Sequence, residues 1–324
     1  MEPWIIAVII AASVIFVLAT VLIPTGIAYK MTFYSNRKKP RDPYRAIEGA
    51  AFDSVREKCR ANIDALYAYP SETVKIPSHD GLMLAAHYYK GREGAPYHLM
   101  FHGYKSSAFL DFSGGAIECI NRRDNVILVD QRAHGESEGK TIAFGVKERR
   151  DVHSWIKYTE ERFGKDIKII LWGISMGAAT VLSSLEFPMP KSVKGVVADC
   201  PFSSPLGIIK LVAGGMGLPL VVVAPLMRPA AIIYGGFRLG KNEAKRAVKK
   251  AKVPVLLIHG DADGFVPRYM SDEIYDAARQ AGVDIRYHVF EGADHAMSYL
   301  VDKERYMSIT DAFLADCLGE NKDK

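Results

Sequence analysis

Cysteine is scarce in the sequence, and what there is does not form a recognisable site. Cys59, Cys119, Cys200 and Cys317 stand far apart, with no Cys-x-x-Cys pair and no Cys/His cluster at metal-ligand spacing. The sequence therefore predicts neither a disulfide framework nor a metal site. We expect free cysteines that are mostly buried. No motif in the sequence calls for a cofactor.

Positive charge is also limited. The 42 Lys and Arg residues against 37 Asp and Glu residues leave a formal net charge of +5 over 324 residues. Most of the excess is local, because the segment from Lys30 to Arg45 is strongly basic and its only acid is Asp42. The rest of the chain is close to neutral, so nucleic-acid binding has little support. Membrane phosphates are the better counter-charge for this cluster, because it adjoins a hydrophobic segment.

Charge is missing altogether from Trp4 to Pro24. In helical form an apolar run of about 20 residues matches the thickness of a bilayer's hydrocarbon core. A cleaved secretory signal would need a basic start and a shorter run, whereas this sequence starts Met1-Glu2-Pro3. We expect residues 1–29 to be a retained, single-pass transmembrane anchor in the cell membrane. The basic cluster that follows favours a cytoplasmic location for the rest of the chain.

The remainder of the chain has the pattern of an α/β fold. Residues 30–71 are predicted to be a basic linker and a helix, with apolar positions spaced for one face at Ile47, Ala51, Val55, Cys59, Ile63 and Leu66. A hairpin is expected over Glu72–Ile76 and Leu82–Tyr89, around the turn Asp80-Gly81. Short apolar runs then alternate with helix-length segments such as Phe144–Phe163 and Arg268–Ala281; the runs are His98–His102, Val126–Asp130, Ile167–Trp172, Val193–Asp199, Val255–His259 and Ile285–Phe290. This alternation predicts a mostly parallel sheet flanked by helices, with the hairpin at one edge.

One segment, residues 205–240, breaks this alternation. It is rich in Gly, Pro and large apolar residues, and its only charges are Lys210, Arg228 and Arg238. A second membrane span is the alternative, but Pro219, Pro225 and Pro229 would interrupt a helix there. We expect a small helical cap inserted between two strands, which could line an acyl pocket or touch the bilayer.

The strongest chemical signal is Gly173-Ile174-Ser175-Met176-Gly177. A Gly-x-Ser-x-Gly string alone is weak, but this one follows the buried run Ile167–Trp172 and precedes the helix-forming Ala178–Leu185. A strand, a sharp turn and a helix are the setting in which such a serine acts as a nucleophile. The sequence therefore predicts that Ser175 is catalytic.

A serine nucleophile needs a base and an acid that orients the base. Of the histidines after Ser175, His259 ends one strand and His288 lies within another, whereas His295 is in the loop beyond the last strand. His295 is therefore the predicted base. Asp261 and Asp263 share the loop after Val255–Ile258; Asp261 suits a turn, and Asp263 is the predicted acid.

Two backbone amides are expected to form an oxyanion hole. One is the N–H of Met176, directly after the nucleophile, and the other is the N–H of Tyr104, after the strand His98–His102. Gly103 would allow close approach. The polar segment Asp130–Ser137 is interpreted as a brace for this region, with Arg132 and His134 as scaffold residues rather than catalysts.

From about Glu72 to the C-terminus the chain resembles the α/β-hydrolase superfamily. The resemblance rests on His102-Gly103, Asp130–Ser137, Gly173–Gly177, His259-Gly260 with Asp263 and Val266-Pro267, and His295, which match in order and spacing. In detail the chain is similar to bacterial membrane-anchored hydrolases of the serine aminopeptidase-like and monoacylglycerol lipase-like kind. The resemblance implies an eight-stranded core over 72–204 and 241–320, a cap over 205–240, and the triad Ser175, Asp263 and His295.

The function expected from these features is hydrolysis of carboxylic esters through an acyl-enzyme on Ser175, on small-molecule substrates that could be lipid-like. Cleavage of peptides or amides, and acyl transfer to another alcohol, would use the same triad. The sequence shows no fixed acidic pocket for a free amine. The alternative that is not an enzyme is a membrane-tethered scaffold protein. Such a protein would normally have lost a triad residue.

Overall fold

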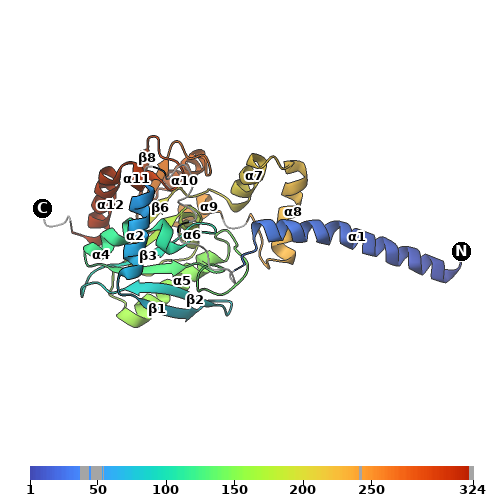
Figure 1. The fold of residues 1–324 in the computed structure, drawn as a ribbon, viewed down its shortest axis with the longest axis horizontal. Helices are drawn as coiled ribbons and strands as arrows, with labels where there is room; N and C mark the ends of the chain where they lie inside the picture. The colour runs from blue at the N-terminus through green and yellow to red at the C-terminus, as the bar shows by residue number, and fades with distance from the viewer. Residues whose placement is uncertain (37–43, 45–52, 54, 241–242, 321–324) are drawn as a thin grey trace.

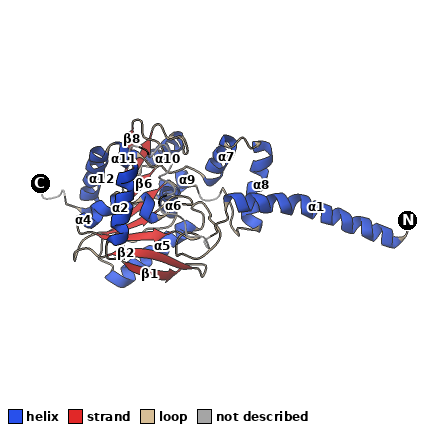
Figure 2. Ribbon diagram, in the orientation of Figure 1, coloured by secondary structure: helices blue, strands red, loops and turns tan. Residues whose placement is uncertain are grey.

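A computed structural model of the chain describes residues 1–36, 44, 53, 55–240 and 243–320. Figure 1 shows a rounded α/β domain from which one long helix, α1 (Pro3–Thr32), projects with the N-terminus at its far end. The sheet lies between two layers of helices in Figure 2.

The sheet has eight strands in the order β1-β2-β4-β3-β5-β6-β7-β8. Strand β2 pairs antiparallel with β1 and β4, and all other neighbours are parallel. The strands are β1 (Glu72–Pro77), β2 (Met83–Tyr89), β3 (Tyr97–Phe101), β4 (Asn125–Asp130), β5 (Ile169–Ile174), β6 (Val193–Asp199), β7 (Val255–Gly260) and β8 (Ile285–Phe290). The predicted α/β-hydrolase fold, with a hairpin at one edge of a mostly parallel sheet, is confirmed.

Both faces of the sheet are covered by apolar side chains. Because side chains alternate along a strand, Leu99 and Phe101 of β3 enter one core cluster and Met100 enters the other. The first cluster is closed by α5 (Glu148–Phe163), α6 (Met176–Ser184), α9 (Ala244–Ala247), the 3-10 turn Val248–Lys250 and α10 (Tyr269–Gln280). The second is closed by α2 (Arg56–Ala68), α3 (Ala108–Asp111), α4 (Gly115–Asn121) and α12 (Lys303–Leu318), and α11 (Ser298–Val301) precedes α12.

Several predicted boundaries differ from the observed ones. Strand β3 ends at Phe101, one residue before His102, and β5 runs on to Ile174, at the edge of the serine turn. Helix α5 begins at Glu148 rather than Phe144, because Phe144 and Gly145 have φ of 52° and 87°, outside the right-handed helical region. The helix predicted within residues 40–69 is α2; Ile47 and Ala51 lie outside the described residues.

Helix α1 is 30 residues long, and it is the one helix in the described part of the chain that is long and apolar enough to cross a membrane. It continues past the predicted boundary at residue 29, because its last turns pack on the globular domain. Thr25 and Phe33 are buried there, and Tyr234 donates a 2.7 Å hydrogen bond to the carbonyl of Leu22. The outer part of α1 is exposed.

The predicted cap region, residues 205–240, contains α7 (Pro205–Gly215) and α8 (Leu220–Ile233). Of the three prolines predicted to interrupt a helix, Pro219 lies at the break between α7 and α8, whereas Pro225 and Pro229 do not interrupt α8 but lie inside it. Each proline removes one backbone hydrogen bond. The burial of Met227, Ala230 and Ala231 against a third apolar cluster, which includes the end of α1, offsets that loss.

Two glycines allow β5 and α6 to meet at Ser175. A Cβ on Gly173 would lie 2.4 Å from the backbone of Gly177 and Ala178, and a Cβ on Gly177 would lie 1.7 Å from the carbonyl oxygen of Phe101. Both contacts are with backbone atoms, which cannot rotate away. The helix therefore packs against β3 at a distance that only glycine permits.

We predict that Gly177→Ala destabilises the domain by about 3 kcal/mol or more, because overpacking against rigid backbone forces β3 and α6 apart. Thermal unfolding would measure the loss. Gly215→Ala is the matched control, since a Cβ at Gly215 meets nothing within 4 Å. Equal melting temperatures for the two variants would contradict the packing argument.

Candidate active site

Ser175 occupies a strained turn at the carboxyl end of β5. Its φ is 55° and its ψ is −115°, a conformation that L-residues rarely adopt, and its N–H donates a 2.8 Å hydrogen bond to the carbonyl of Asp199 on β6. The next residue, Met176, begins α6. The serine hydroxyl therefore stands at the N-terminus of a helix, where the first N–H groups have no partner within the helix.

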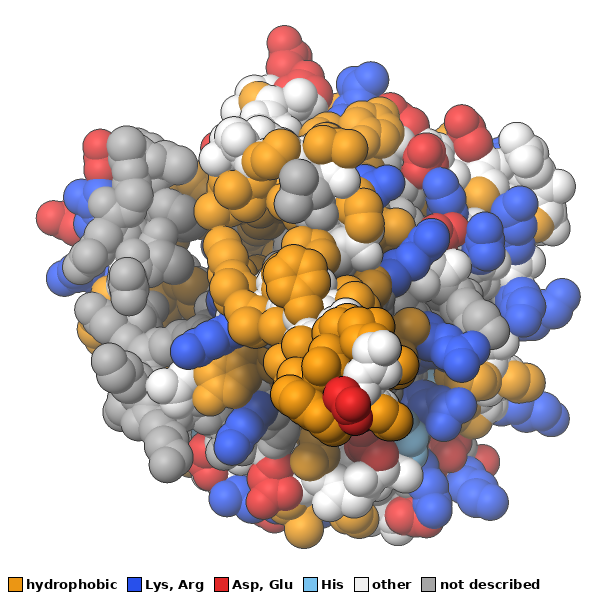
Figure 3. Space-filling view, turned by 90° about the vertical axis from the view of Figure 1, so that its right-hand side faces the viewer, with side chains coloured by type: hydrophobic (Ala, Val, Ile, Leu, Met, Phe, Trp, Pro, Cys, Tyr) orange, Lys and Arg blue, Asp and Glu red, His pale blue; other side chains and the backbone are white. Residues whose placement is uncertain are grey.

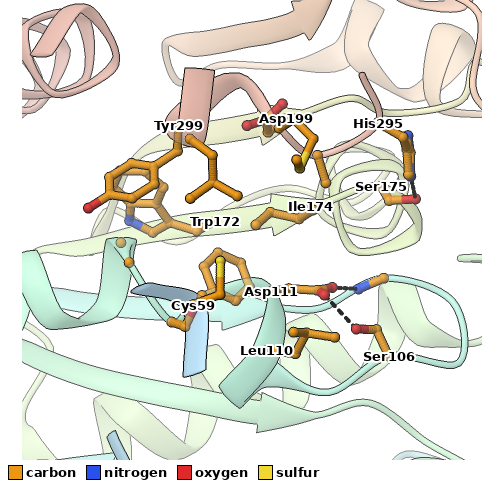
Figure 4. A pocket seen from close by; sticks show the side chains of 18 of the residues that line it. Cys59, Ser106, Leu110, Asp111, Trp172, Ile174, Ser175, Asp199, His295 and Tyr299 are labelled. Carbon is orange, nitrogen blue, oxygen red and sulfur yellow. Dashed lines mark hydrogen bonds between the residues drawn. The ribbon is translucent and has the colours of Figure 1, made fainter. Parts of the chain in front are cut away.

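The predicted base and acid lie next to this serine. His295, in the loop after β8, places Nε2 2.9 Å from Ser175 Oγ and Nδ1 2.8 Å from Asp263 Oδ2. The first of these bonds is visible in Figure 4. A single tautomer satisfies both contacts, with the Nδ1 proton donated to Asp263 and Nε2 accepting the hydroxyl proton of Ser175. The three residues thus form one hydrogen-bonded chain.

Asp263 is buried, yet its surroundings favour the carboxylate. Burial opposes ionisation, but hydrogen bonds from His259 and His295 outweigh it and hold the pKa of Asp263 well below its usual range. The backbone N–H groups of Phe265 and Val266 also donate to Oδ1, at 2.9 and 2.7 Å. Asp263 is therefore a fixed negative charge facing the Nδ1 proton of His295.

The other candidate residues have structural roles. His259 is buried, bonds to Ser271 Oγ at 2.6 Å and to the carbonyl of Val266 at 2.8 Å, and lies 3.2 Å from Asp263. Asp261 accepts a 2.7 Å hydrogen bond from the N–H of Gly292, which ties the two loops together. His288 is half-buried on β8.

The loop after β3 approaches Ser175 closely. A Cβ on Gly103 would lie 3.3 Å from Ser175 Cβ, and the Gly103 N–H is bonded to Asp111 Oδ2 at 2.6 Å. Asp111 therefore fixes the loop at Gly103. Tyr104 is the next residue in this loop. Tyr104 lines the same cavities as Ser175, and Met176 is the residue directly after Ser175; that their N–H groups form an oxyanion hole stays a prediction.

The polar segment Asp130–Ser137 supports this loop from behind. His134 Nε2 accepts the N–H of Lys105 at 3.0 Å, and His102 Nε2 accepts the N–H of Gln131 at 3.2 Å. Arg132 is buried between Asp151 and Asp80, at 2.6 and 2.9 Å. These contacts are those of scaffold residues, as interpreted from the sequence.

Two clusters of potential metal ligands occur among the described residues. In His79, Asp80 and Asp151 both carboxylates are already paired with the guanidinium of Arg132, whose positive charge disfavours a second cation there. The other cluster adds Cys200 to Asp263 and His295, and burial raises the pKa of the Cys200 thiol well above its usual value. A protonated thiol is a poor metal ligand.

A cavity of about 380 Å³ adjoins Ser175 and contains acids that sequence reasoning missed. Asp111 and Asp199 line it together with His295, Trp172 and Tyr299 (Figure 4). The two acids come from α3 and the end of β6, so no sequence spacing connects them. An acidic wall of this kind could not be recognised in the sequence, although the cap region left room for one.

Asp199 is an unusual member of this wall. It is buried, and its Oδ1 has no hydrogen-bond partner in the described part of the chain. Burial raises its pKa to about 6, although His259 and a hydrogen bond with Tyr306 act in the opposite direction. Near neutral pH this carboxyl is an available acceptor beside the candidate nucleophile.

We predict that Asp199 makes the protein less stable as pH rises. The proton is held more tightly in the folded state, so stability falls between pH 3.8 and about 6 and the total loss is about 3 kcal/mol. Asp199→Asn removes this dependence and should gain stability over the parent chain as pH rises through that window. Chemical unfolding at several pH values measures it, with Asp166→Asn on an exposed loop as control. A stability difference that is the same at all pH values would contradict the assignment.

Comparisons with known proteins agree with this architecture. A family model described as the α/β-hydrolase fold matches residues 99–218, and one for the prolyl oligopeptidase family matches residues 239–321. The second match contains Asp263 and His295, and the first contains Ser175.

The similar proteins include one bacterial and one fungal sequence and an archaeal structure. The uncharacterized protein YqkD of Bacillus subtilis is 28% identical over 59% of this chain and 62% of its own length. The thiohydrolase aneE of Aspergillus aculeatus is 29% identical over 40% of this chain and 41% of its own length. The esterase Pf2001 of Pyrococcus furiosus superposes with a TM-score of 0.64 at 21% identity, covering 87% of this chain and 98% of that one. The chain thus has the α/β-hydrolase fold, and its two halves are similar to families of that superfamily.

Proposed function

We propose that the chain is a serine hydrolase that cleaves carboxylic esters through an acyl-enzyme on Ser175. The observation that carries the proposal is the hydrogen-bonded chain from Ser175 Oγ through His295 to Asp263, with both contacts below 3 Å. A nucleophile, a base and an orienting acid in this geometry are the arrangement that activates a serine hydroxyl.

In the first step His295 Nε2 takes the proton of the Ser175 hydroxyl as Oγ attacks the acyl carbonyl carbon. The imidazolium that forms is stabilised by the carboxylate of Asp263, whose low pKa keeps it ionised. The proton then passes from His295 to the leaving alcohol when the carbon–oxygen bond breaks. Water, deprotonated by the same histidine, releases the acid from Ser175.

The oxyanion of each tetrahedral intermediate would be held by the N–H groups of Met176 and Tyr104. Met176 is the first residue of α6, so its N–H points out of the helix. The loop that carries Tyr104 is fixed at Gly103 by Asp111 and at Lys105 by His134. Each donor of this kind contributes about 3 kcal/mol to transition-state stabilisation.

Helix α1 is proposed to anchor the protein in the cell membrane, with the catalytic domain in the cytoplasm. Its apolar, exposed surface and the basic residues that follow it support both parts of this proposal. The segment 205–240 is proposed as the cap, since α7 and α8 lie beside the end of α1, on the side of the domain from which α1 projects (Figure 1).

A second candidate function is cleavage of substrates that carry a free amine, such as aminoacyl amides. The observation in its favour is the cavity wall formed by Asp111 and Asp199, since a carboxylate is the natural partner of an ammonium group. The match of residues 239–321 to the prolyl oligopeptidase family is compatible with it but covers only the acid and base.

We predict that Ser175→Ala lowers kcat for p-nitrophenyl esters by at least about 10⁴-fold, because the nucleophile is lost. Ser184→Ala is the matched control: this buried serine lies at the other end of α6, and its hydroxyl donates to the carbonyl of Val181. Aminoacyl p-nitroanilides tested in parallel separate the two candidate functions. Full ester hydrolysis by the alanine variant would exclude Ser175 as the nucleophile.

We predict for the membrane anchor that a reporter active only outside the cytoplasm gives no signal when it is joined after Pro40. The same reporter joined at Met1 should be active, because the helix then places it on the opposite side. The reverse pattern would place the catalytic domain outside the cytoplasm.

A further inference from the structure

A second cavity, of about 480 Å³, begins at Ser175 and extends to the membrane helix. One wall is the last part of α1, and the other walls come from α7, α8 and the loops after β6 and β7; the lining residues on α1 are Pro24, Ile27, Ala28, Met31 and Thr32. It shares Ser175, Tyr104 and Phe265 with the cavity of about 380 Å³. The nucleophile therefore stands between two compartments.

The two compartments differ in chemistry. Among the residues that the structure describes, no charged one lines the second cavity, and the only hydroxyl-bearing side chains there are those of Thr32, Tyr104 and Ser175. The first cavity has Asp111, Asp199 and Asp294 on its wall. An alkyl chain loses no hydrogen bonds in the second cavity, whereas a polar leaving group finds acceptors in the first. The volume of the second lies in the range of ligand pockets, about 300–1,000 Å³.

The second cavity reaches the surface beside the membrane helix. Ile27, Met31 and Met216 line it, yet their side chains are 56%, 54% and 64% exposed. In Figure 3, which faces the side from which α1 projects, apolar side chains gather around α1 with Lys and Arg side chains next to them. Exposed apolar residues of the cap add to this patch, namely Leu211, Leu220, Val221, Ile232 and Ile233.

The two segments that form this patch carry charges of one sign only. Residues 3–35 contain Lys30 as their only charged residue, residues 201–240 contain only Lys210, Arg228 and Arg238, and neither segment has an acid. An apolar patch continuous with a membrane-length helix and accompanied by basic residues matches a bilayer surface rather than another protein. Ile27 and Met31 follow the apolar run Trp4–Pro24, so the opening lies where α1 would leave the hydrocarbon.

Helix α1 is also bonded to the loop that carries the candidate oxyanion amide. The Tyr104 hydroxyl donates a 2.7 Å hydrogen bond to the carbonyl of Thr32, and Lys105 Nζ donates to the carbonyl of Met31 at 3.4 Å. Tyr29 and Thr141 share a 2.6 Å hydrogen bond between their hydroxyls. These contacts hold the end of α1 in a fixed position over Ser175.

On these observations we propose that α1 is a wall of the acyl-binding site as well as an anchor, and that the substrate is a long-chain acyl ester that moves from the bilayer directly into the second cavity. The acyl chain then lies along α1 while the leaving alcohol occupies the cavity with the acids. This inference rests on the proposed serine hydrolase function.

The test uses the full chain in phospholipid vesicles and a fluorophosphonate with a dodecyl chain that ends in a diazirine. Ser175 Oγ forms a bond to phosphorus as fluoride leaves, and light then converts the diazirine into a carbene with loss of nitrogen gas. Mass spectrometry of the digested protein should find the cross-link within residues 24–32 or 208–227. Cross-links confined to the first cavity, around Leu110 or Leu300, would overturn the inference while leaving the hydrolase function intact. Absence of label on Ser175 would reject both.

Substitutions give a second, independent measurement. Ala28→Trp fills the second cavity from α1, and Ala213→Trp fills it from α7; both alanines are buried. Each should lower the ratio of p-nitrophenyl laurate to p-nitrophenyl acetate hydrolysis by at least about tenfold, because excluding even one methylene from an apolar pocket has an effect of that size. Ala12→Trp, on the exposed part of α1, is the matched control and should leave the ratio unchanged. Unchanged ratios in both cavity variants would contradict the proposal.

Discussion

The turn at Ser175 is the constraint on which the rest of the structure depends. Strand β5 has to end and α6 has to begin within one residue, with φ of 55° at the serine. That is possible because Gly173 and Gly177 bring α6 against β5 and the carbonyl of Phe101, at distances that exclude a Cβ. Since β3 is held against the same helix, the loop after β3 is carried to the serine. One backbone geometry thus aligns the hydroxyl, the helix N-terminus and the Tyr104 loop.

Hydrogen bonds from backbone N–H groups fix the two loops that carry Asp263 and His295. Asp263 is fixed by the N–H groups of Phe265 and Val266, and its loop is joined to the His295 loop through the Asp261–Gly292 bond. His259, buried beneath them, bonds to Val266. The carboxylate that bonds to His295 Nδ1 is thus held from behind by backbone N–H groups, which keeps the imidazole directed at Ser175.

The sequence predicts those features of the fold and the site that depend on neighbouring residues, and not those that depend on contacts between distant parts of the chain. The strands, the serine turn and the order of Ser175, Asp263 and His295 follow from local patterns, and the structure brings these residues together as expected. Asp111 and Asp199 were missed because they reach the cavity from separate elements, and nothing in their neighbouring residues marks them. A helical cap was expected, but not that one of its helices continues through Pro225 and Pro229, because propensity is local whereas the packing of α8 on α1 and α7 is not.

Packing α1 onto the domain also changes what a membrane anchor can do. A flexible tether would only raise the local concentration of enzyme at the bilayer, whereas α1 contributes Ala28 and Met31 to a cavity that ends at Ser175. An alkyl chain that moves from lipid into such a cavity exchanges one apolar environment for another, so the hydrophobic effect neither drives nor opposes the step. Selection among acyl chains would then depend on the shape of the cavity. Because Tyr104 is bonded to Thr32, the helix that shapes the cavity also positions the loop at which the oxyanion would form.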